Sequence, residues 1–574
     1  MVEQITGAEL LMRSLEAEGV DTVFGYPGGS IIKVYDKLYD HTDTINHILV
    51  RHEQGATHAA QGYARVSGKP GVVIVTSGPG ATNVVTGISD AMVDSTPLVV
   101  ITGQVDSRFL GTDAFQETDL LGITLPITKW ACQVRRAKDI PAAVARAFFI
   151  AGSGRPGPVV IDITADAQGE LVDAVEHEKV TYIRSYEPNP EPEEGEMARA
   201  VSLLNMAERP MILAGQGVLI SNATKELVEF AEKGDIPVGC TLMGMSALPS
   251  KHRLFKGMLG MHGNIGPNIN TNRADVIVAV GMRFDNRVTG DLEQYAPKAK
   301  IIHIDIDESE FNKNVKADIC IHSDARVALR KLATRMDERK HPEWINSFDK
   351  MNADERTLVI EPILNRPSEC GISMPQVIGM VAEKSGGDAV IVTDVGQNQM
   401  WGARQSVYNR PRSLVTSGGL GTMGFGIPAA FGAKVAAPER QVVLFTGDGS
   451  FQMTLQELGT IMEQKTAVKI VILNNSYLGN VRQWQELFYG RRYSFTPMTN
   501  PDFVTLCAAY NIPAENVETP EALSGAIDRM LEAETPYLLN VNIAPTDNVF
   551  PMTPGNAAVD FVMLSPTEIY SPND

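Results

Sequence analysis

Two short polar motifs, each directly after an apolar run, carry the residue types of a magnesium site. The run Val442–Phe445 leads into Thr-Gly-Asp-Gly-Ser with its carboxylate at Asp448, and Ile470–Leu473 leads into Asn-Asn, which ends at Asn475. These two polar residues lie 27 positions apart, about the length of one strand–helix–strand unit. Both side chains would then lie at the carboxyl ends of neighbouring parallel strands, where open α/β sheets bind ligands. An Asp carboxylate, an Asn carbonyl and a nearby backbone carbonyl form an all-oxygen set that suits Mg²⁺.

The glycines beside Asp448 would let a diphosphate approach the backbone, and a helix expected over 451–464 would offer its N-terminal amides to that group. The other interpretation is a sharp turn in which Asp448 is only a helix N-cap. Gly-Asp-Gly alone favours that turn. The combination with Asn475, each motif following a buried strand, favours a site for a metal and a diphosphate.

Short apolar runs rich in Val and Ile recur along the whole chain and do not alternate with polar residues. Such runs are typical of strands that are buried on both faces, as in parallel sheets covered by helices. Because helix-like stretches lie between them, they predict a doubly wound α/β fold with mainly parallel sheets. The runs are Val72–Val75, Leu98–Ile101, Val159–Ile161, Met211–Ala214, Val276–Val280, Ile301–Ile306, Ala389–Val392, Val442–Phe445 and Ile470–Leu473.

Two segments interrupt this pattern. Residues 170–196 are polar and rich in Pro and Glu, and residues 335–372 lack strand-like runs and hold many charges. We interpret both as linkers between domains. The expected α/β units are 1–168, 190–335 and 370–550, followed by a C-terminal tail at 551–574.

Composition excludes several classes of protein. The 574 residues include 50 Lys+Arg and 69 Asp+Glu, a formal net charge of −19, and 44% are hydrophobic. This indicates an ordinary globular protein and argues against nucleic-acid binding, which needs a basic face. The five cysteines are odd in number and far apart, which suits reduced thiols. No signal-peptide pattern and no apolar run of about 20 residues is present, so we expect a cytoplasmic protein rather than a membrane protein.

The chain as a whole resembles the large, catalytic subunits of acetohydroxyacid synthase (acetolactate synthase), a family that depends on thiamine diphosphate (ThDP). Gly-Asp-Gly-Ser followed by Asn-Asn is similar to the ThDP fingerprint, and the resemblance runs from about residue 5 to about residue 555. The motifs that carry it are FGYPGG (24–29), RHEQGATHAAQGYAR (51–65), TSGPGATN (76–83), GTDAFQE (111–117), SGRPGP (153–158), MLGMHG (258–263), GMRFDNRVTG (281–290), HIDID (303–307), TSGGLGTMGFG (416–426), GDGSFQMTLQEL (447–458), NNSYLGNVRQWQ (474–485) and VFPMTPG (549–555).

The resemblance implies three domains: an N-terminal one for the pyrimidine of ThDP, a central FAD-binding-like one, and a C-terminal one for the diphosphate and Mg²⁺. It implies that Glu53 activates the pyrimidine, which requires a carboxylate within hydrogen-bond reach. Taken alone, Glu53 opens an expected helix of small residues after Ile48–Val50, where a Glu usually only stabilises the helix dipole. The resemblance also implies a homodimer or a tetramer, with Glu53 facing Asp448 and Asn475 of a partner chain.

The family pattern adds further ThDP positions. Met423 matches the residue that supports the bent shape of the cofactor, although a core Met is the ordinary alternative. Gly419, Gly421 and Gly424 also form GxGxxG, but no strand with an acidic end follows about 20 residues later, which disfavours a dinucleotide loop. Asp448, Asn475 and the backbone of Tyr477 would hold the metal. The implied ThDP contacts are Gly396, Gln397, Asn398, Gly421, Met423, Gly447, Asp448, Gly449, Ser450, Asn475, Tyr477, Gly479, Asn480 and Val481.

A second cofactor, FAD, is implied in the central unit by resemblance. Arg suits phosphate, and an Asp after a strand suits ribose hydroxyls. Without the resemblance, His-Ile-Asp-Ile-Asp is only a buried strand that ends at a turn. The matching positions are Arg155, Gly215, Gln216, Gly217, Thr241, Leu242, Met243, Met261, His262, Gly281, Arg283, Asp305, Ile306 and Asp324.

The implied reaction is that of a transferase: pyruvate is decarboxylated on ThDP, and the hydroxyethyl enamine condenses with pyruvate or 2-oxobutyrate. The products, 2-acetolactate and 2-aceto-2-hydroxybutyrate, lead to valine, leucine and isoleucine. Gly29, Phe115 and Gln116 match catalytic positions around the reacting carbon. Arg287 matches a residue near the second 2-oxo acid, whose carboxylate a guanidinium can pair, and Trp484 matches the residue that favours 2-oxobutyrate. A surface Arg and a core Trp are the ordinary alternatives, and a regulatory small subunit is expected from the family.

Some positions depart from the family pattern without removing a group that activates ThDP or binds the metal. An FAD-independent catabolic acetolactate synthase or a pyruvate oxidase shares the architecture and remains an alternative. A non-catalytic binding protein of this fold is disfavoured by the presence of the candidate Glu and metal ligands. The departures are Asn286 for Asp, Asn398 for His, Asn480 for Met, and Thr164-Ala165 for Pro-Lys.

Overall fold

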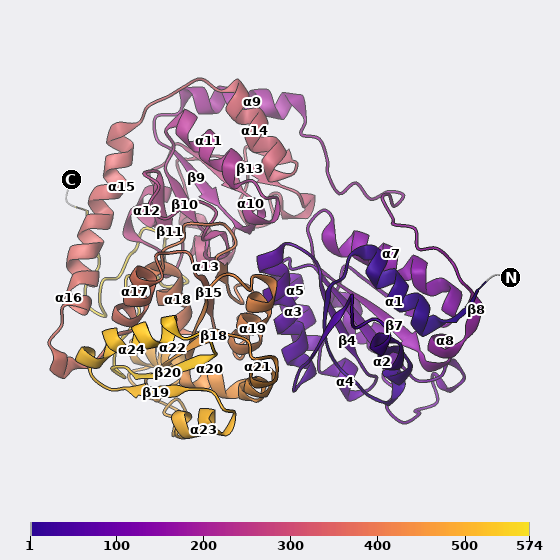
Figure 1. Cartoon of the computed structure of the whole chain (residues 1–574). Helices are drawn as coiled ribbons and strands as arrows, with labels where there is room; N and C mark the ends of the chain where they lie inside the picture. Colours follow the sequence, from indigo (N-terminus) through magenta and orange to yellow (C-terminus); the bar gives the residue numbers. More distant parts are fainter. Residues whose placement is uncertain (1–2, 573–574) are drawn as a thin grey trace.

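The computed structural model describes residues 3–572 and contains three six-stranded sheets, all of whose paired strands are parallel (Figure 1). The predicted α/β fold with mainly parallel sheets is therefore confirmed, and each predicted apolar run lies in or overlaps a strand. The N-terminal sheet comprises β2 (Thr22–Tyr26), β3 (Asn46–Leu49), β4 (Gly71–Val75), β5 (Leu98–Gln104), β6 (Trp130–Val134) and β7 (Pro158–Thr164). The central sheet comprises β9 (Pro210–Ala214), β10 (Val238–Cys240), β11 (Phe255–Met258), β12 (Val276–Val280), β13 (Lys300–Asp305) and β14 (Ile319–His322). The C-terminal sheet comprises β15 (Val390–Thr393), β16 (Leu414–Val415), β17 (Val442–Gly447), β18 (Val468–Asn474), β19 (Ala514–Val517) and β20 (Tyr537–Asn542).

Helices cover both faces of each sheet, which explains why the strands are apolar along their whole length. In the N-terminal unit they are α1 (Gly7–Glu18), α2 (Ile32–Tyr39), α3 (Glu53–Ser67), α4 (Pro79–Thr82), α5 (Val85–Val93), α6 (Leu120–Thr124), α7 (Ile140–Gly152) and α8 (Ala165–Gly169). In the central unit they are α9 (Glu194–Met206), α10 (Gln216–Ile220), α11 (Thr224–Gly234), α12 (Ile265–Thr271), α13 (Asn286–Thr289) and α14 (Ala325–Arg335). After α15 (Pro342–Glu355) and α16 (Glu361–Leu364), the C-terminal unit has α17 (Met374–Lys384), α18 (Gln397–Gln405), α19 (Gly426–Ala436), α20 (Asp448–Met453), α21 (Leu458–Gln464), α22 (Gly479–Phe488), α23 (Phe503–Ala509) and α24 (Pro520–Glu532).

The two outer sheets share one strand order. Numbered within each sheet, the N-terminal and C-terminal strands both run 2-1-3-4-6-5, whereas the central strands run 3-2-1-4-5-6. In both kinds of sheet the order reverses beside the first strand, and ligands of open α/β sheets bind at the carboxyl ends of the strands near that point. The topology thus marks one candidate ligand edge in each unit.

Helices α3 and α19 join the N-terminal and C-terminal units (Figure 1). Their backbones touch: a Cβ added at Gly62 would lie 2.0 Å from the Ala429 carbonyl oxygen, and one added at Gly432 would lie 1.8 Å from the Ala59 oxygen. The small residues that the sequence places in α3 are therefore needed for this close approach. The expectation of a helix opening at Glu53 is confirmed.

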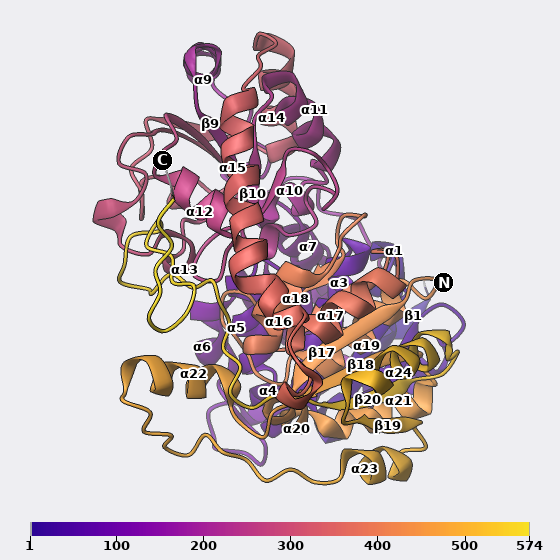
Figure 2. The ribbon, with the colours of Figure 1, turned by 90° about the vertical axis from the view of Figure 1, so that its left-hand side faces the viewer.

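The segment 335–372 is mostly helical, which the sequence reasoning missed. Helix α15 runs along the outside of the molecule from the central unit toward α16 and α17 (Figure 2). Trp344, Phe348 and Met351 recur at helical spacing on its buried face, and this periodicity was hidden by the many charges around them. At its end, Glu355 forms a buried ion pair with Arg404 of α18.

The last described residues pack on the central unit. The Thr553 amide donates to the Met261 carbonyl oxygen at 2.7 Å, and the Tyr570 hydroxyl donates to Asp354 at 2.6 Å. Figure 2 shows this segment in yellow beside α12 and α13. Of the helices formed by residues 3–572, none combines the length and apolarity required to span a lipid bilayer.

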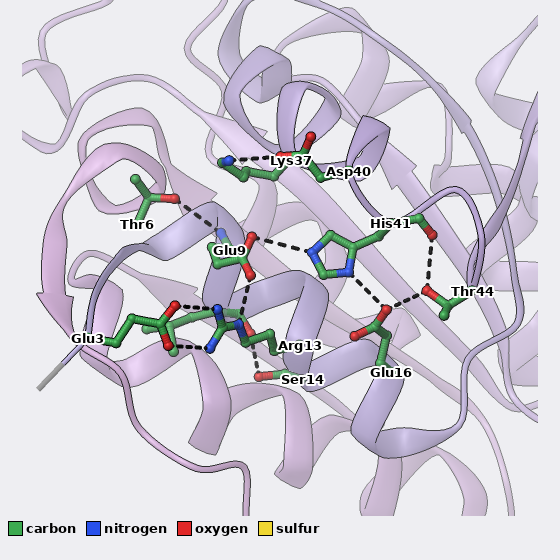
Figure 3. A network of polar contacts seen from close by, with 11 residues as sticks. Glu3, Thr6, Glu9, Arg13, Ser14, Glu16, Lys37, Asp40, His41 and Thr44 are labelled. Carbon is green, nitrogen blue, oxygen red and sulfur yellow. Dashed lines mark hydrogen bonds and ion pairs between the residues drawn. The ribbon is translucent and has the colours of Figure 1, made fainter.

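A polar network ties α1 to the turn after α2 (Figure 3). The His41 ring lies between two carboxylates of α1, 2.8 Å from Glu16 and 3.3 Å from Glu9, and Arg13 bridges Glu9 and Glu3. Burial opposes the charged ring, but the hydrogen bonds that the ring donates to Glu16 and Glu9 outweigh it and raise the pKa of His41. Protonated His41 therefore stabilises the packing of α1.

We predict that His41→Gln destabilises the protein at low pH only. Because the folded-state pKa is raised, the stabilisation is fully present below the ordinary value near 6.5 and is lost as the pH rises through the higher folded-state value. The expected loss at pH 6 is on the order of 1 kcal/mol or less, since the site is partly exposed. Thermal unfolding at pH 6 and pH 8.5 measures it.

His252→Gln is the matched control, because His252 contacts one carboxylate, Glu232, at 3.1 Å rather than two. The difference in Tm between wild type and His41→Gln should shrink at pH 8.5. An equal difference at both pH values would contradict the assigned role of His41.

Candidate functional site

The structure brings Asp448 and Asn475 to adjacent strand ends of the C-terminal sheet. β17 and β18 pair in parallel, with Gly447 opposite Leu473, so the residues that follow both strands emerge at one edge. Asp448 is 1% exposed, and its Oδ2 accepts a 2.7 Å hydrogen bond from Asn500, while its buried Oδ1 has no partner. Burial raises the pKa of Asp448. A buried carboxylate oxygen without a donor is what a bound cation would satisfy.

Asp448 is not the N-cap of a helix, so the alternative in which it serves only as a cap is wrong. Gly447 is the N-cap residue of α20, and no side chain caps that helix. Within residues 3–572, no three His, Cys, Asp or Glu side chains are grouped to hold a metal ion. A metal here would therefore depend on one carboxylate together with amide and carbonyl oxygens, the kind of set that Mg²⁺ accepts.

The ends of β15 and β18 are linked beside this edge. The Gln397 Oε1 accepts from the Asn475 Nδ2 at 3.4 Å, and its Nε2 donates to Gln483 at 3.0 Å. A Cβ added at Gly479 would lie 2.4 Å from the same Gln397 oxygen, so a larger residue there would displace the Gln397 side chain. The amide oxygen of Asn398 is buried without a partner. One polar cluster thus contains or adjoins four of the predicted ThDP positions, Gln397, Asn398, Asn475 and Gly479.

Asp394 is a residue of this edge that the sequence reasoning missed. It is fully buried at the end of β15, where its carboxylate accepts from the amides of Val395 at 2.9 Å and of Gly424 and Gly426 at 3.0 Å. Burial raises the pKa of Asp394 to about 6. The signal was available, because Asp394 follows a buried strand as Asp448 does.

Glu53 lies at the first position of α3, half-buried, with its side chain toward the residues that follow β4. The Asn83 amide donates to its Oε2 at 2.9 Å, and a Cβ added at Gly80 would lie 3.3 Å from its Oε1. The amide of Arg51, just before α3, donates instead to Glu457 of the C-terminal unit at 3.1 Å. Glu457 therefore places a carboxylate at the N-terminus of α3, so Glu53 is not needed to stabilise the helix dipole. Asn83 had been given no role from the sequence.

Two further predicted catalytic residues lie near Glu53. Gln116 has a left-handed backbone, with φ of +61°, and lies against Gly78, whose added Cβ would be 2.9 Å from the Gln116 Cβ. Gly29 follows β2 and faces open space. Phe115 is 88% exposed, which is unusual for so large an apolar side chain.

A cavity of about 520 Å³ lies at the carboxyl ends of the central strands. Its size is typical of a cofactor site. Every position that the sequence assigned to FAD lines it except Gly215, whose added Cβ would lie 2.1 Å from the Gly281 carbonyl oxygen. Gly215 thus serves the close packing of two backbone segments. The wall also includes Arg287, Trp484, Asn480 and Gly421, but none of Glu53, Gly29, Phe115, Gln116, Asp448, Asn475 and Tyr477.

Several charged residues of this cavity already have protein partners. Arg155 donates to Ser95 at 2.9 Å, Asp307 at 3.0 Å and Glu310 at 2.7 Å. Burial opposes the charge of Arg155, but Glu310 and Asp307 outweigh it and raise its pKa. Asp324 accepts from the amides of Arg326 and Val327 and so caps α14. These residues therefore also have structural roles.

Burial shifts the pKa of two other cavity residues. Burial raises the pKa of Asp305 to about 6. The Nδ1 of His262 is buried without a partner, and burial lowers the pKa of His262 to about 3, so the ring is neutral.

Polar groups without protein partners gather where the cavity meets α22. The Arg287 guanidinium carbon lies 5.3 Å from the centre of the Trp484 ring, and its Nη1 lies 3.6 Å from the Met261 sulfur. In the part of the chain described, no carboxylate pairs with Arg287. The Trp484 Nε1 and the Asn480 Oδ1 are buried without a partner. This end of the cavity offers a cation, a donor and an amide to a small polar ligand.

The loop 417–424 is held by two aspartates of the N-terminal unit. Asp94 accepts from the amides of Gly418 and Gly419 at 2.9 and 2.7 Å and from Arg65 at 2.7 Å. Asp90 accepts from the hydroxyls of Ser417 and Thr422. Amides in the GxGxxG stretch are thus bonded to carboxylates, which agrees with the prediction that it is not a dinucleotide loop.

Models of known protein families match most of the chain. Three family models match it: the N-terminal TPP binding domain of thiamine pyrophosphate enzymes over residues 5–123, their central domain over 197–332 and their C-terminal TPP binding domain over 394–541. Thiamine pyrophosphate is another name for ThDP. Each of the three models overlaps a different one of the three parallel sheets.

Curated relatives match over nearly their whole length. The chain is 44% identical to the acetolactate synthase isozyme 2 large subunit of Escherichia coli, covering 96% of this chain and 98% of that protein. It is 44% identical to a probable acetolactate synthase large subunit of Methanocaldococcus jannaschii, at 97% and 95% coverage. It is also 44% identical to the acetolactate synthase of Mycobacterium bovis, at 98% and 92% coverage.

We predict that Asp94→Asn destabilises the protein by about 3 kcal/mol, because it leaves Arg65 as a buried charge without a counter-charge. Denaturant unfolding followed by tryptophan fluorescence measures the loss. Asp40→Asn, which breaks the exposed pair with Lys37, is the control and should cost less than about 1 kcal/mol. Similar small effects of the two variants would show that Asp94 does not hold the 417–424 loop.

Proposed function

The chain belongs to the acetolactate synthase large subunits of the thiamine pyrophosphate enzyme family, and we propose that it decarboxylates pyruvate and joins the remaining two carbons to a second 2-oxo acid. With pyruvate as the second substrate the product is 2-acetolactate, and with 2-oxobutyrate it is 2-aceto-2-hydroxybutyrate. This reaction would place the enzyme in branched-chain amino-acid biosynthesis. The proposal depends above all on the buried Asp448 Oδ1, which has no protein partner.

The C-terminal residues fit a metal-bound diphosphate. When bound, ThDP supplies a carbanion that attacks the 2-oxo acid and an electron sink for the loss of carbon dioxide. Asp448, the Asn475 side chain and the Tyr477 carbonyl would hold Mg²⁺. Gln397 and Gly479 shape the adjoining edge, and the amides at the start of α18 would face the diphosphate.

Glu53 would hold a proton at N1′ of the pyrimidine. The hydrogen bond from Asn83 fixes one of its carboxylate oxygens, and within residues 3–572 the other accepts no hydrogen bond. Gly80 and Gly78 leave room beside the carboxylate, and Gln116 lies next to Gly78. Asn83 is thus a positioning residue for Glu53.

We propose that the protein forms a homodimer or a tetramer in which two chains together complete each active site. Glu53 contacts residues of the N-terminal unit and Asp448 contacts residues of the C-terminal unit, and no hydrogen bond described for residues 3–572 joins the two groups. Both units expose large apolar side chains, as expected of an interface. These are Tyr26, Ile32, Phe109, Phe115, Ile123 and Leu125 on the N-terminal unit, and Leu420, Met453, Val481, Phe488, Tyr489 and Phe495 on the C-terminal unit.

The second 2-oxo acid would bind where the cavity meets α22. Arg287 lacks a carboxylate partner in the described chain, so it can pair with the substrate carboxylate. Trp484 lies against Arg287 and would contact the substrate alkyl group. Asn480 places an unpaired amide in the same wall.

The large cavity fits FAD in position and lining. It lies at the switch point of the central sheet, and its unpaired His262 Nδ1 is available to a ligand. The phosphates would meet Arg155 or Arg283, and Asp305 would meet a ribose. FAD and the domain limits 1–168, 190–335 and 370–550 remain predictions, as does a small regulatory subunit, to which the names of the relatives point.

Product analysis tests the proposal. Purified protein with ThDP, Mg²⁺ and pyruvate should form acetolactate, and added 2-oxobutyrate should yield the mixed product. Omission of FAD should lower the rate if the cavity holds it. Uptake of oxygen without acetolactate would instead support a pyruvate oxidase, and equal rates without FAD an FAD-independent synthase.

We predict that Glu53→Gln lowers acetolactate formation by at least about 100-fold, because an amide cannot hold the proton. The initial rate with saturating ThDP and Mg²⁺ measures this. Glu463→Gln is the control, since Glu463 is an exposed carboxylate paired with Arg51 and should leave the rate nearly unchanged. Near-normal turnover of Glu53→Gln would refute the role.

We predict that Trp484→Leu lowers the preference for 2-oxobutyrate over pyruvate by at least about 10-fold, through loss of contact with the extra methylene group. The ratio of the two products in direct competition measures this preference. Tyr489→Leu, at an exposed residue just beyond α22, serves as the comparison. An unchanged ratio in Trp484→Leu would remove that residue from the acceptor site.

A further inference from the structure

A second cavity, of about 170 Å³, lies where the three units meet. Its wall combines Arg65 of α3, Leu219 and Ile220 of α10, and Arg412 and Leu414 at the start of β16. It shares six residues with the large cavity, namely Ser95, Pro156, Gln216, Ile220, Leu242 and Met243, of which Gln216, Leu242 and Met243 are predicted FAD positions. It contains none of the residues assigned to ThDP or the metal.

The charge of this wall is one-sided. The whole chain has a formal net charge of −19. In contrast, the part of the cavity wall that residues 3–572 form contains two arginines and no Asp or Glu. Arg65 is neutralised by Asp94. Arg412 has no carboxylate partner in the same range, and burial lowers its pKa.

Hydrogen bonds fix the Arg412 guanidinium in place but do not use all of its N–H donors. It donates to the carbonyl oxygens of Arg65 at 3.1 Å and Leu219 at 2.9 Å and to Asn222 at 3.2 Å. A guanidinium has five N–H donors, so some remain for a ligand. Backbone contacts hold the group at the cavity, and its charge is left for an anion.

The rest of the wall is partly polar, with Ser95, Thr96, Gln216 and Thr416, and partly aliphatic. Leu219, Ile220, Leu242 and Leu414 face the same space, together with prolines 70, 97 and 156. A phosphate would leave these side chains against a polar ion, whereas a ligand with one charged and one apolar end satisfies both parts of the wall. A cavity of about 150 Å³ holds benzene, so this one suits about seven non-hydrogen atoms.

We propose that this cavity binds a short branched aliphatic carboxylate, with the carboxylate paired to Arg412 and the alkyl group against the leucines. Binding would stiffen the junction of the three units, because Arg412 already joins the end of α3 to α10. β16 leads from Arg412 directly into the 417–424 loop, so an occupant would also restrain that loop. The proposal does not depend on the reaction proposed above.

The test uses 3-methylbutanoate as the probe and the full-length protein. Equilibrium dialysis should give saturable binding with a Kd on the order of 1 mM, together with a rise in Tm. The uncharged 3-methylbutanamide and inorganic phosphate, at equal ionic strength, should bind at least about 10-fold more weakly. Equal binding of the amide or the phosphate would overturn the proposal.

Variants locate the site. Arg412→Met should raise the Kd at least about 10-fold, and Arg412→Lys, which keeps the charge, should raise it less. Arg410→Met, at an exposed residue paired with Asp388, is the matched control and should bind as wild type does. Arg287→Met should keep the binding that Arg412→Met loses. Binding that survives in Arg412→Met and is lost in Arg287→Met would place the ligand in the large cavity and refute the proposal.

Discussion

Direct backbone contact between α3 and α19 fixes the relation of the N-terminal unit to the C-terminal unit. Gly62 and Gly432 have no room for a Cβ, because each faces a carbonyl oxygen of the other helix. Once the helices are this close, Glu457 reaches the start of α3, and Asp94 and Asp90 reach the 417–424 loop. The placement of Glu53 and of that loop therefore depends on two glycines that take no part in the chemistry.

The second organising constraint is the shared direction of the strands. Parallel strands end at one edge, so each unit gathers its polar residues there without needing them to be near in sequence. Some of these residues find partners within the chain, as Asp324 and Asp394 do. Others, including Asp448 Oδ1, His262 Nδ1 and Trp484 Nε1, have none. Buried polar atoms normally have partners, so these three atoms, which lie in the candidate sites, are available to a ligand.

Fold class and the pair Asp448–Asn475 could be predicted from sequence because both depend on local signals. An apolar run marks a strand, and a polar motif after it marks the strand end. Contacts between residues far apart in the chain leave no such signal, which is why Asn83, Asn500 and the Asp94–Arg65 pair were missed. The helix α15 was missed for another reason, since its buried face is narrow and surrounded by charges.

The common strand order of the outer units has an evolutionary consequence. α3 connects the second and third strands of the N-terminal sheet, and α19 connects the second and third strands of the C-terminal sheet. Equivalent helices that pack against each other form the arrangement found at the twofold interface of two identical subunits. Duplication and fusion of one ancestral subunit account for both observations. By that account the chain contains an old dimer interface in its interior, and the central unit, with its different strand order, is a later insertion between the two copies.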